Sequence, residues 1–157
     1  MSDFTYVRAH SLQEALDFLG ETDQKSRILA GGTDLVNQFR SGEVSCNRVV
    51  DVAHVPELKT INVAGEIRIG AAVTFTEILA HPALHERAPL LVQSCRTIGS
   101  PQIRNIATIG GNVVNAAACA DTLPALVCLG ANAVVVSRSG EYLVPVADLV
   151  TGVNRTM

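Results

Sequence analysis

The sequence predicts an α+β fold, in which a small parallel βαβ unit precedes a unit of helices and antiparallel hairpins. Within the first 55 residues, two strand-like segments flank a helix-like segment, an order typical of a right-handed parallel crossover. Farther along, two pairs of alternating apolar and polar segments meet at short glycine turns, which indicates β-hairpins. Between the hairpins, apolar residues recur at helical spacing. We therefore divide the chain into residues 1–55 and residues 56–157.

The first unit begins with a helix and ends with a strand. Ser11 and Glu14 form a capping box ahead of a helix with one apolar face, which we expect to end at Gly20. "RILAG" predicts a buried strand that runs into a Gly-Gly pair. "LVNQFRSG" predicts a second helix, capped by Thr33 or Asp34 and ended by its glycine. "NRVVDV" predicts the parallel partner strand.

In the second unit, hairpins lie on either side of the helices. A capping box from Thr74 to Glu77 opens a short helix that should stop before Pro82. The other expected elements are a hairpin of "KTINV" and "EIRIGA" around Ala64-Gly65, helices in "APLLVQSCRTIG" and "DTLPALVCLG", and a hairpin of "NAVVVS" and "EYLVPV" around Ser139-Gly140.

Composition excludes several classes of protein. Of the 157 residues, 48% are hydrophobic and 17% charged, with a formal net charge of −3, which excludes a disordered chain. There is no block of Lys or Arg for a nucleic acid or an anionic membrane. The longest apolar stretch, Leu123 to Val136, is broken by Pro124 and Gly130 and is shorter than the roughly 20 residues of a spanning helix. With no signal sequence at its start, we expect a soluble, cytoplasmic protein.

Cysteine and histidine spacing indicates no metal site. The cysteines form no CxxC pair and the histidines no HExxH pattern, and such patterns mark most zinc and iron–sulfur sites. Only His81 and His85 share helical spacing, and Pro82 lies between them. We expect reduced, mostly buried thiols. The cysteines are Cys46, Cys95, Cys119 and Cys128, and the histidines are His10, His54, His81 and His85.

A first glycine segment, Ile28 to Leu35 and called loop one below, joins a predicted strand to a predicted helix. Its sequence "ILAGGTDL" places free backbone N–H groups at a helix start, where the helix dipole also favours an anion. Glycine removes the Cβ that would keep a phosphate from the backbone. The segment is neither a P-loop nor a GxGxxG motif. By itself it is compatible with a phosphate site and with a simple turn.

A second glycine segment, Thr108 to Asp121 and called loop two below, repeats the Gly-Gly pair. Its glycines are followed by Asn112, Asn115 and a run of small residues. The amides and Asp121 offer hydrogen-bond partners to ring or sugar edges, although a tightly packed bend would use the same residues. One such loop in each unit favours a long, phosphate-containing ligand that lies between the units.

These segments resemble the FAD-binding subunit of the molybdenum-hydroxylase family, which includes bacterial xanthine, nicotinate, carbon monoxide and 4-hydroxybenzoyl-CoA oxidoreductases. The resemblance rests on "AGGTDL", "IGSPQIRNIATIGGN" and the trailing Asp121, and it extends from "FTYVRAHSLQEAL" to "VPVADLVTG". It implies the two-subdomain FAD-binding fold of the vanillyl-alcohol-oxidase type. It also implies a C-terminal domain, which we expect to be absent from this chain.

The resemblance further implies which residues hold FAD. Loop one should wrap the pyrophosphate through its N–H groups and the Thr33 hydroxyl, and the start of loop two should hold the other side of the diphosphate and the ribityl chain. Asp121 should hydrogen-bond to the cofactor. For Arg104, a phosphate clamp and a structural ion pair both remain open. The implied cofactor-binding residues, including two near the adenosine half (Ile98 and Gly99), are Ile28, Leu29, Ala30, Gly31, Gly32, Thr33, Asp34, Leu35, Ile98, Gly99, Thr108, Ile109, Gly110, Gly111, Asn112 and Asp121.

The implied function is electron transfer within an oxidoreductase complex, with no catalytic side chain and no metal ligand in this chain. Partner subunits should carry the other centres, molybdopterin on a large subunit and 2Fe–2S clusters on a small one. A separate chain could supply the C-terminal domain, and NAD+ is the implied acceptor. Two alternatives remain: a stand-alone flavin oxidase or reductase, for which Cys119 is the one candidate for covalent attachment inside a loop, and a non-catalytic assembly fragment without flavin.

Overall fold

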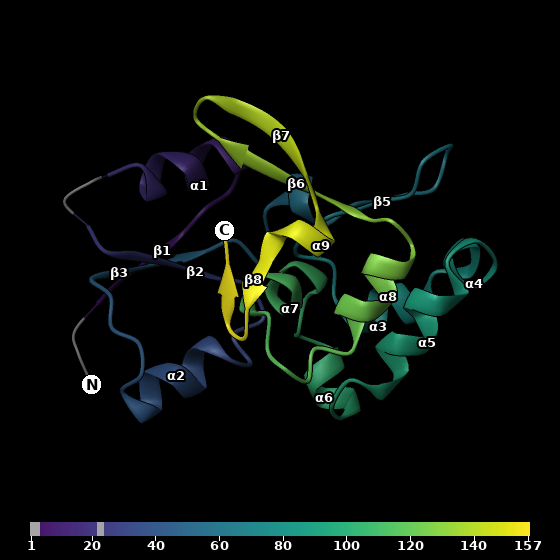
Figure 1. The fold of residues 1–157 in the computed structure, drawn as a ribbon. Coiled ribbons are helices and arrows are strands. Elements are labelled where there is room, and N and C mark those ends of the chain that lie inside the picture. Colours follow the sequence, from purple (N-terminus) through teal and green to yellow (C-terminus); the bar gives the residue numbers. More distant parts are fainter. Residues whose placement is uncertain (1–3, 22–23) are drawn as a thin grey trace.

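The computed structural model describes residues 4–21 and 24–157. Its N-terminal part contains β1 (Thr5–Arg8), α1 (Leu12–Leu19), β2 (Ser26–Leu29), α2 (Leu35–Ser41) and β3 (Arg48–Asp51). The three strands form a parallel sheet in the order β1-β3-β2, seen at the left of Figure 1. The predicted βαβ unit is therefore confirmed as β2-α2-β3. Strand β1, which the sequence did not indicate, is largely exposed and so lacks the apolar pattern of a buried strand.

The ends of α1 and α2 follow local chemistry to different degrees. The Ser11 hydroxyl accepts the Glu14 amide at 3.1 Å, and the Glu14 carboxylate accepts the His10 amide at 2.7 Å, so the predicted helix start is confirmed. Asp34 occupies the N-cap position of α2, as predicted, but its side chain makes no cap bond. Gly42 ends α2 in the left-handed conformation, with φ of 77°.

The second part of the chain follows β3. Its elements are the single 3₁₀ turn η1 (Pro56–Leu58), β4 (Ile61–Asn62), β5 (Arg68–Ile69), α3 (Phe75–Ala80), α4 (Pro82–Arg87), α5 (Pro89–Thr97), α6 (Pro101–Arg104), α7 (Ile109–Asn115), α8 (Thr122–Cys128), β6 (Asn132–Ser137), β7 (Gly140–Pro145), α9 (Val146–Leu149), β8 (Val150–Gly152) and β9 (Arg155–Thr156). Both predicted hairpins are present, as β4-β5 and β6-β7. In Figure 1, β6-β7 extends back over α1, where Arg138 donates to the Asp17 carbonyl at 3.2 Å.

Loop two departs from its predicted form because its glycines lie inside a helix. Helix α7 begins directly after Thr108, and its first turn contains both Gly110 and Gly111. Paired glycines lower helix propensity, which is why the sequence indicated a loop. Hydrogen bonds from the first amides of α7 to carbonyls distant in the sequence stabilise the helix instead.

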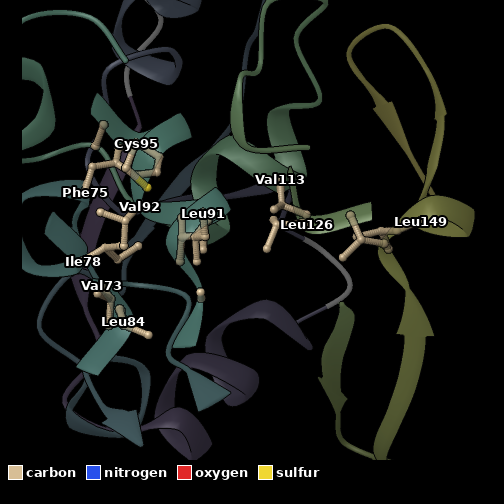
Figure 2. Packing of buried hydrophobic residues seen from close by; sticks show 14 residues of the cluster. Val73, Phe75, Ile78, Leu84, Leu91, Val92, Cys95, Val113, Leu126 and Leu149 are labelled. Carbon is tan, nitrogen blue, oxygen red and sulfur yellow. The ribbon is translucent and has the colours of Figure 1, made fainter. Parts of the chain in front are cut away.

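Two hydrophobic clusters support these parts. The smaller one fills the space between α1 and the parallel sheet. The larger one is built mainly from α3, α4, α5, α7 and α8 (Figure 2). The residues of the smaller cluster are Ala9, Ala15, Val50, Val52 and Val55. Those labelled in Figure 2 are Val73, Phe75, Ile78, Leu84, Leu91, Val92, Cys95, Val113, Leu126 and Leu149.

The four thiols divide evenly between core and surface. Cys46 and Cys95 are buried, whereas Cys119 and Cys128 are exposed, and all four are unpaired. Burial, opposed by a hydrogen bond with Ser94, raises the pKa of the Cys95 thiol to about 12. The four unpaired thiols agree with the expectation of reduced cysteines. The expectation that the thiols are mostly buried is wrong, because Cys119 and Cys128 are exposed. Of the helices described, none has the length and apolar character needed to cross a membrane.

Candidate functional site

Loop one presents backbone N–H groups that the protein does not use. Among the described residues, the structure gives no acceptor for the amides of residues 31–35. The loop is held instead through its carbonyls: Gly32 accepts the Val36 amide at 3.1 Å, and Thr33 accepts the Asn37 side-chain amide at 2.8 Å. Unpaired N–H groups cost free energy if water or a ligand does not reach them. This row of donors therefore suits the oxygens of a phosphate or diphosphate.

The start of loop two is the opposite case, because its amides are satisfied within the protein. Ile109 and Gly110 donate to the carbonyls of Val73 and Ala71 at 3.0 and 2.9 Å. Gly111 donates to the Thr108 hydroxyl at 3.1 Å. Thr108 is buried and forms an isolated antiparallel bridge with Thr74. These bonds anchor the N-terminal end of α7 to the segment before α3 and leave few backbone donors for a ligand.

The structure brings the two loops side by side. The α-carbon of Gly31 lies so close to the Ile106 carbonyl, just before loop two, that a Cβ there would collide with it. A second contact joins α2 to α7, because the Gln38 side-chain amide donates to the Asn115 side-chain oxygen at 3.4 Å. Sequence reasoning missed Ile106 and Gln38, because no local pattern shows that residues so distant in sequence are neighbours.

The four loop glycines have different physical roles. Gly31 and Gly110 are required for packing: a Cβ on Gly110 would lie 2.6 Å from the Ala71 side chain. Gly32 has a φ of +72°, a conformation that L residues rarely adopt. A Cβ on Gly111 would approach only the Thr108 hydroxyl, at 3.0 Å, so one side of Gly111 is open. Gly32 is therefore required for its backbone conformation, and Gly111 is the position where a ligand could approach the backbone closely.

The remaining side chains named for cofactor binding lie around this pair of loops. Asp121 is the exposed residue that precedes α8, and its carboxylate accepts the Thr97 hydroxyl at 3.0 Å. Asn112 accepts a hydrogen bond from the buried Thr122 hydroxyl, which fixes α7 against α8. Gly99 turns the chain after α5 with a φ of +43°.

Arg104 does not form the structural ion pair considered for it. Its Nη1 donates to the carbonyls of Ile98, Gly99 and Arg96 at 2.8, 3.1 and 3.4 Å. Within the described part of the chain, no carboxylate lies within ion-pair distance of its guanidinium. The guanidinium instead binds the backbone at the C-terminal end of α5.

Chemistry outside this region is limited among the described residues. No cluster of three or more His, Cys, Asp or Glu side chains is arranged to hold a metal ion within residues 4–21 and 24–157. A cavity of about 420 Å³ is lined by Lys59, Glu77 and His81 together with apolar residues. There Lys59 and Glu77 form an ion pair at 2.8 Å, so these two charges already neutralise one another. The two glycine loops thus remain the better candidate for a ligand.

Comparison with known proteins identifies the ligand type. Residues 2–157 match the family described as the FAD binding domain in molybdopterin dehydrogenase. The chain belongs to this family. The recognition made from the glycine loops is thereby confirmed, and the free amides of loop one fit the diphosphate of FAD.

Several curated relatives have similar sequences. The putative xanthine dehydrogenase FAD-binding subunit XdhB of Escherichia coli (strain K12) is 36% identical over 155 residues, which cover 97% of this chain and 53% of that protein. The glyceraldehyde dehydrogenase medium chain of Sulfolobus acidocaldarius is 36% identical over 151 residues, or 96% of this chain and 53% of that protein. The chain thus spans about half the length of the curated relatives it matches.

Solved structures agree on the fold. A chain of carbon monoxide dehydrogenase from Hydrogenophaga pseudoflava superposes with a TM-score of 0.95 at 27% identity, covering 99% of this chain and 55% of that one. A chain of quinoline 2-oxidoreductase from Pseudomonas putida 86 superposes with a TM-score of 0.93 at 29% identity, covering 99% and 54%. The predicted α+β FAD-binding fold is therefore confirmed.

Proposed function

We propose that this domain belongs to the FAD-binding, electron-transferring subunit of a molybdenum-containing hydroxylase or dehydrogenase. The observation that carries the proposal is the row of unpartnered amides at residues 31–35, braced against the segment that leads into loop two. Bound FAD would supply two-electron redox chemistry, accepting electrons from iron–sulfur clusters of a partner and passing them to an acceptor such as NAD+. The chain's own residues bind and orient the cofactor.

Each named residue has a defined part in this proposal. The amides of loop one, helped by the Thr33 hydroxyl, donate to the FAD diphosphate. The open side of Gly111 lets the cofactor approach α7, and Asp121 accepts a hydrogen bond from it. Ile98 and Gly99 line the adenosine half. We assign residues 1–55 and 56–157 to the two FAD-binding subdomains, whose facing loops form the site.

The proposed partners follow from the names of the relatives. Those names describe medium chains and FAD subunits of carbon monoxide, nicotinate and xanthine dehydrogenases, and the similar carbon monoxide dehydrogenase structure is of an enzyme that lacks the Mo-pyranopterin moiety of its molybdenum cofactor. We therefore propose a large molybdopterin subunit and a small iron–sulfur subunit as partners, acting in the cytoplasm. Copurification from the native host, followed by iron and molybdenum analysis, tests this directly, and a chain that copurifies without either metal would contradict it.

Flavin binding is tested on the purified chain itself. Titration with FAD should quench flavin fluorescence, and the gel-filtered complex should retain the visible flavin spectrum. Thr33→Val should weaken binding, because the hydroxyl is lost without a change in shape. Thr5→Val is the matched control, since Thr5 is an exposed threonine on β1, away from the loops. Absence of binding by the parent chain would favour the assembly fragment without flavin.

A further inference from the structure

We infer that Arg104 is a positioning residue for the FAD site: by clamping the turn after α5, it holds the Ile106 backbone where loop one rests. The inference builds on the proposed function, because it explains how the two glycine loops keep their mutual placement. Arg104 itself is placed at the backbone of residues 96–99 and is not assigned to the cofactor.

Arg104 clamps the backbone at the C-terminal end of α5. The carbonyls of Arg96, Ile98 and Gly99 lie at the C-terminal end of α5, where orphan carbonyls and the helix dipole favour a cation. Arg104 meets this need through one nitrogen, with its shortest bond, 2.8 Å, to Ile98. Since no carboxylate in the described chain pairs with it, these carbonyls are its structural partners. The clamp therefore ties α6 to the end of α5.

Backbone hydrogen bonds connect the helix that carries Arg104 to the start of loop two. The Ile106 and Ala107 amides both donate to the Ile103 carbonyl, at 3.1 and 2.8 Å, so the backbone after α6 is continuous with the helix that carries Arg104. The Ala107 carbonyl then accepts the Phe75 amide at 3.2 Å. Only one residue, Thr108, separates this point from the start of α7. A shift of α6 would thus move the beginning of loop two.

The same segment contacts loop one. Gly31 packs directly on the Ile106 carbonyl, with no room for a Cβ. Backbone against backbone leaves no flexible side chain to absorb a displacement. Ile106 therefore serves as the support for the amides of residues 31–35, and Arg104 determines where this support lies. The effect of Arg104 on the cofactor is indirect and passes through Ile106.

Arg87 provides a matched control for this role. Like Arg104, it donates to backbone carbonyls, those of Val63 and Gly65, and it too lies at the end of a helix, α4. Its partners belong to the β4-β5 hairpin and not to either glycine loop. Loss of this clamp should reduce stability without changing the spacing of the loops.

The test compares Arg104→Met, Arg104→Lys and Arg87→Met by hydrogen exchange without flavin and by FAD titration. Arg104→Met should accelerate exchange at the amides of Phe75, Ala107 and Ile109 and weaken FAD binding at least about tenfold. Arg104→Lys should recover part of both effects. Arg87→Met should accelerate exchange only near the β4-β5 hairpin and leave FAD affinity within about twofold.

The outcomes separate this inference from the proposed function. Unchanged exchange at the three amides in Arg104→Met, or an equal loss of FAD affinity in Arg87→Met, would overturn the positioning role. If the parent binds no FAD but Arg104→Met still accelerates exchange at those amides, the proposed function fails and the positioning role of Arg104 stands. Should Arg104→Met fail to fold, Arg104→Lys carries the same exchange test.

Discussion

In loop one, the amides of residues 31–35 have no acceptor within the described chain, whereas in loop two the amides of residues 109–112 all have one. Both segments carry a Gly-Gly pair near the start of a short helix, ahead of α2 in loop one and inside the first turn of α7 in loop two. The difference arises from what lies behind each helix start. Loop two is tied to residues 71–74 and loop one is not, so only loop one keeps its donors free for an anion. The same dipeptide thus accompanies unpaired amides in one place and fully paired amides in the other.

The largest effect is expected at the contact between the loops. Gly31→Ala should lower the free energy of unfolding by up to about 3 kcal/mol, because the new Cβ collides with the Ile106 carbonyl and neither backbone can yield easily. Thermal or denaturant unfolding of the chain without FAD measures this. Parent-like stability of Gly31→Ala would show that the two loops can separate without cost.

A second substitution asks whether loop two contributes side chains to the ligand. Asp121→Ala should weaken FAD binding by about 1–2 kcal/mol, or about 5- to 30-fold, since the carboxylate would no longer accept a hydrogen bond from the cofactor. Asp148→Ala is the control, as Asp148 is exposed on α9. Equal dissociation constants for both variants would remove Asp121 from the site.

Gly111→Ala tests the open side of loop two. A Cβ at this position meets only the Thr108 hydroxyl, and alanine is the better helix former by about 1 kcal/mol. We therefore expect stability without FAD equal to the parent's or slightly higher, combined with FAD binding weakened about fivefold. A variant that loses stability yet binds FAD normally would reverse the distinction between Gly31 and Gly111.

The smallest effect concerns the segment that supports loop two. Partial burial would raise the pKa of the Glu77 carboxyl, but hydrogen bonds from Lys59 and Thr74 outweigh it and hold this pKa below its ordinary value. The Glu77 side chain is 43% exposed, so solvent screens its ion pair with Lys59. Glu77→Gln should therefore cost about 1 kcal/mol or less at neutral pH. Because the folded pKa is lowered, Glu77 stabilises the parent above its ordinary pKa and loses this effect as the pH falls through the folded value.

The measurement is the difference in unfolding free energy between the parent and Glu77→Gln across acidic pH. The difference should be constant near neutral pH and shrink as Glu77 becomes protonated. A difference that grows on acidification would mean that the carboxylate is not stabilised by Lys59 and Thr74.

The elements defined by local chemistry were predictable from the sequence. The Ser11 cap and the Thr74 capping box define where α1 and α3 begin, and the turn at Ser139-Gly140 defines the register of β6-β7. Such signals work because the interacting groups lie within a few residues of each other. The family was also predictable, because the two glycine segments that are typical of it are contiguous sequence motifs.

The tertiary structure decides the structural role of each loop glycine. Nothing near Gly31 in the sequence shows that Ile106 lies against it, and nothing near Gly110 shows that its amide binds the Ala71 carbonyl. Helix α7 forms despite its glycines because these distant carbonyls satisfy its first amides. Whether an amide finds an acceptor, and whether a glycine has room for a side chain, depends on neighbours in space. The sequence by itself therefore shows where the two Gly-Gly pairs lie. Only the tertiary structure decides which pair keeps its amide donors free.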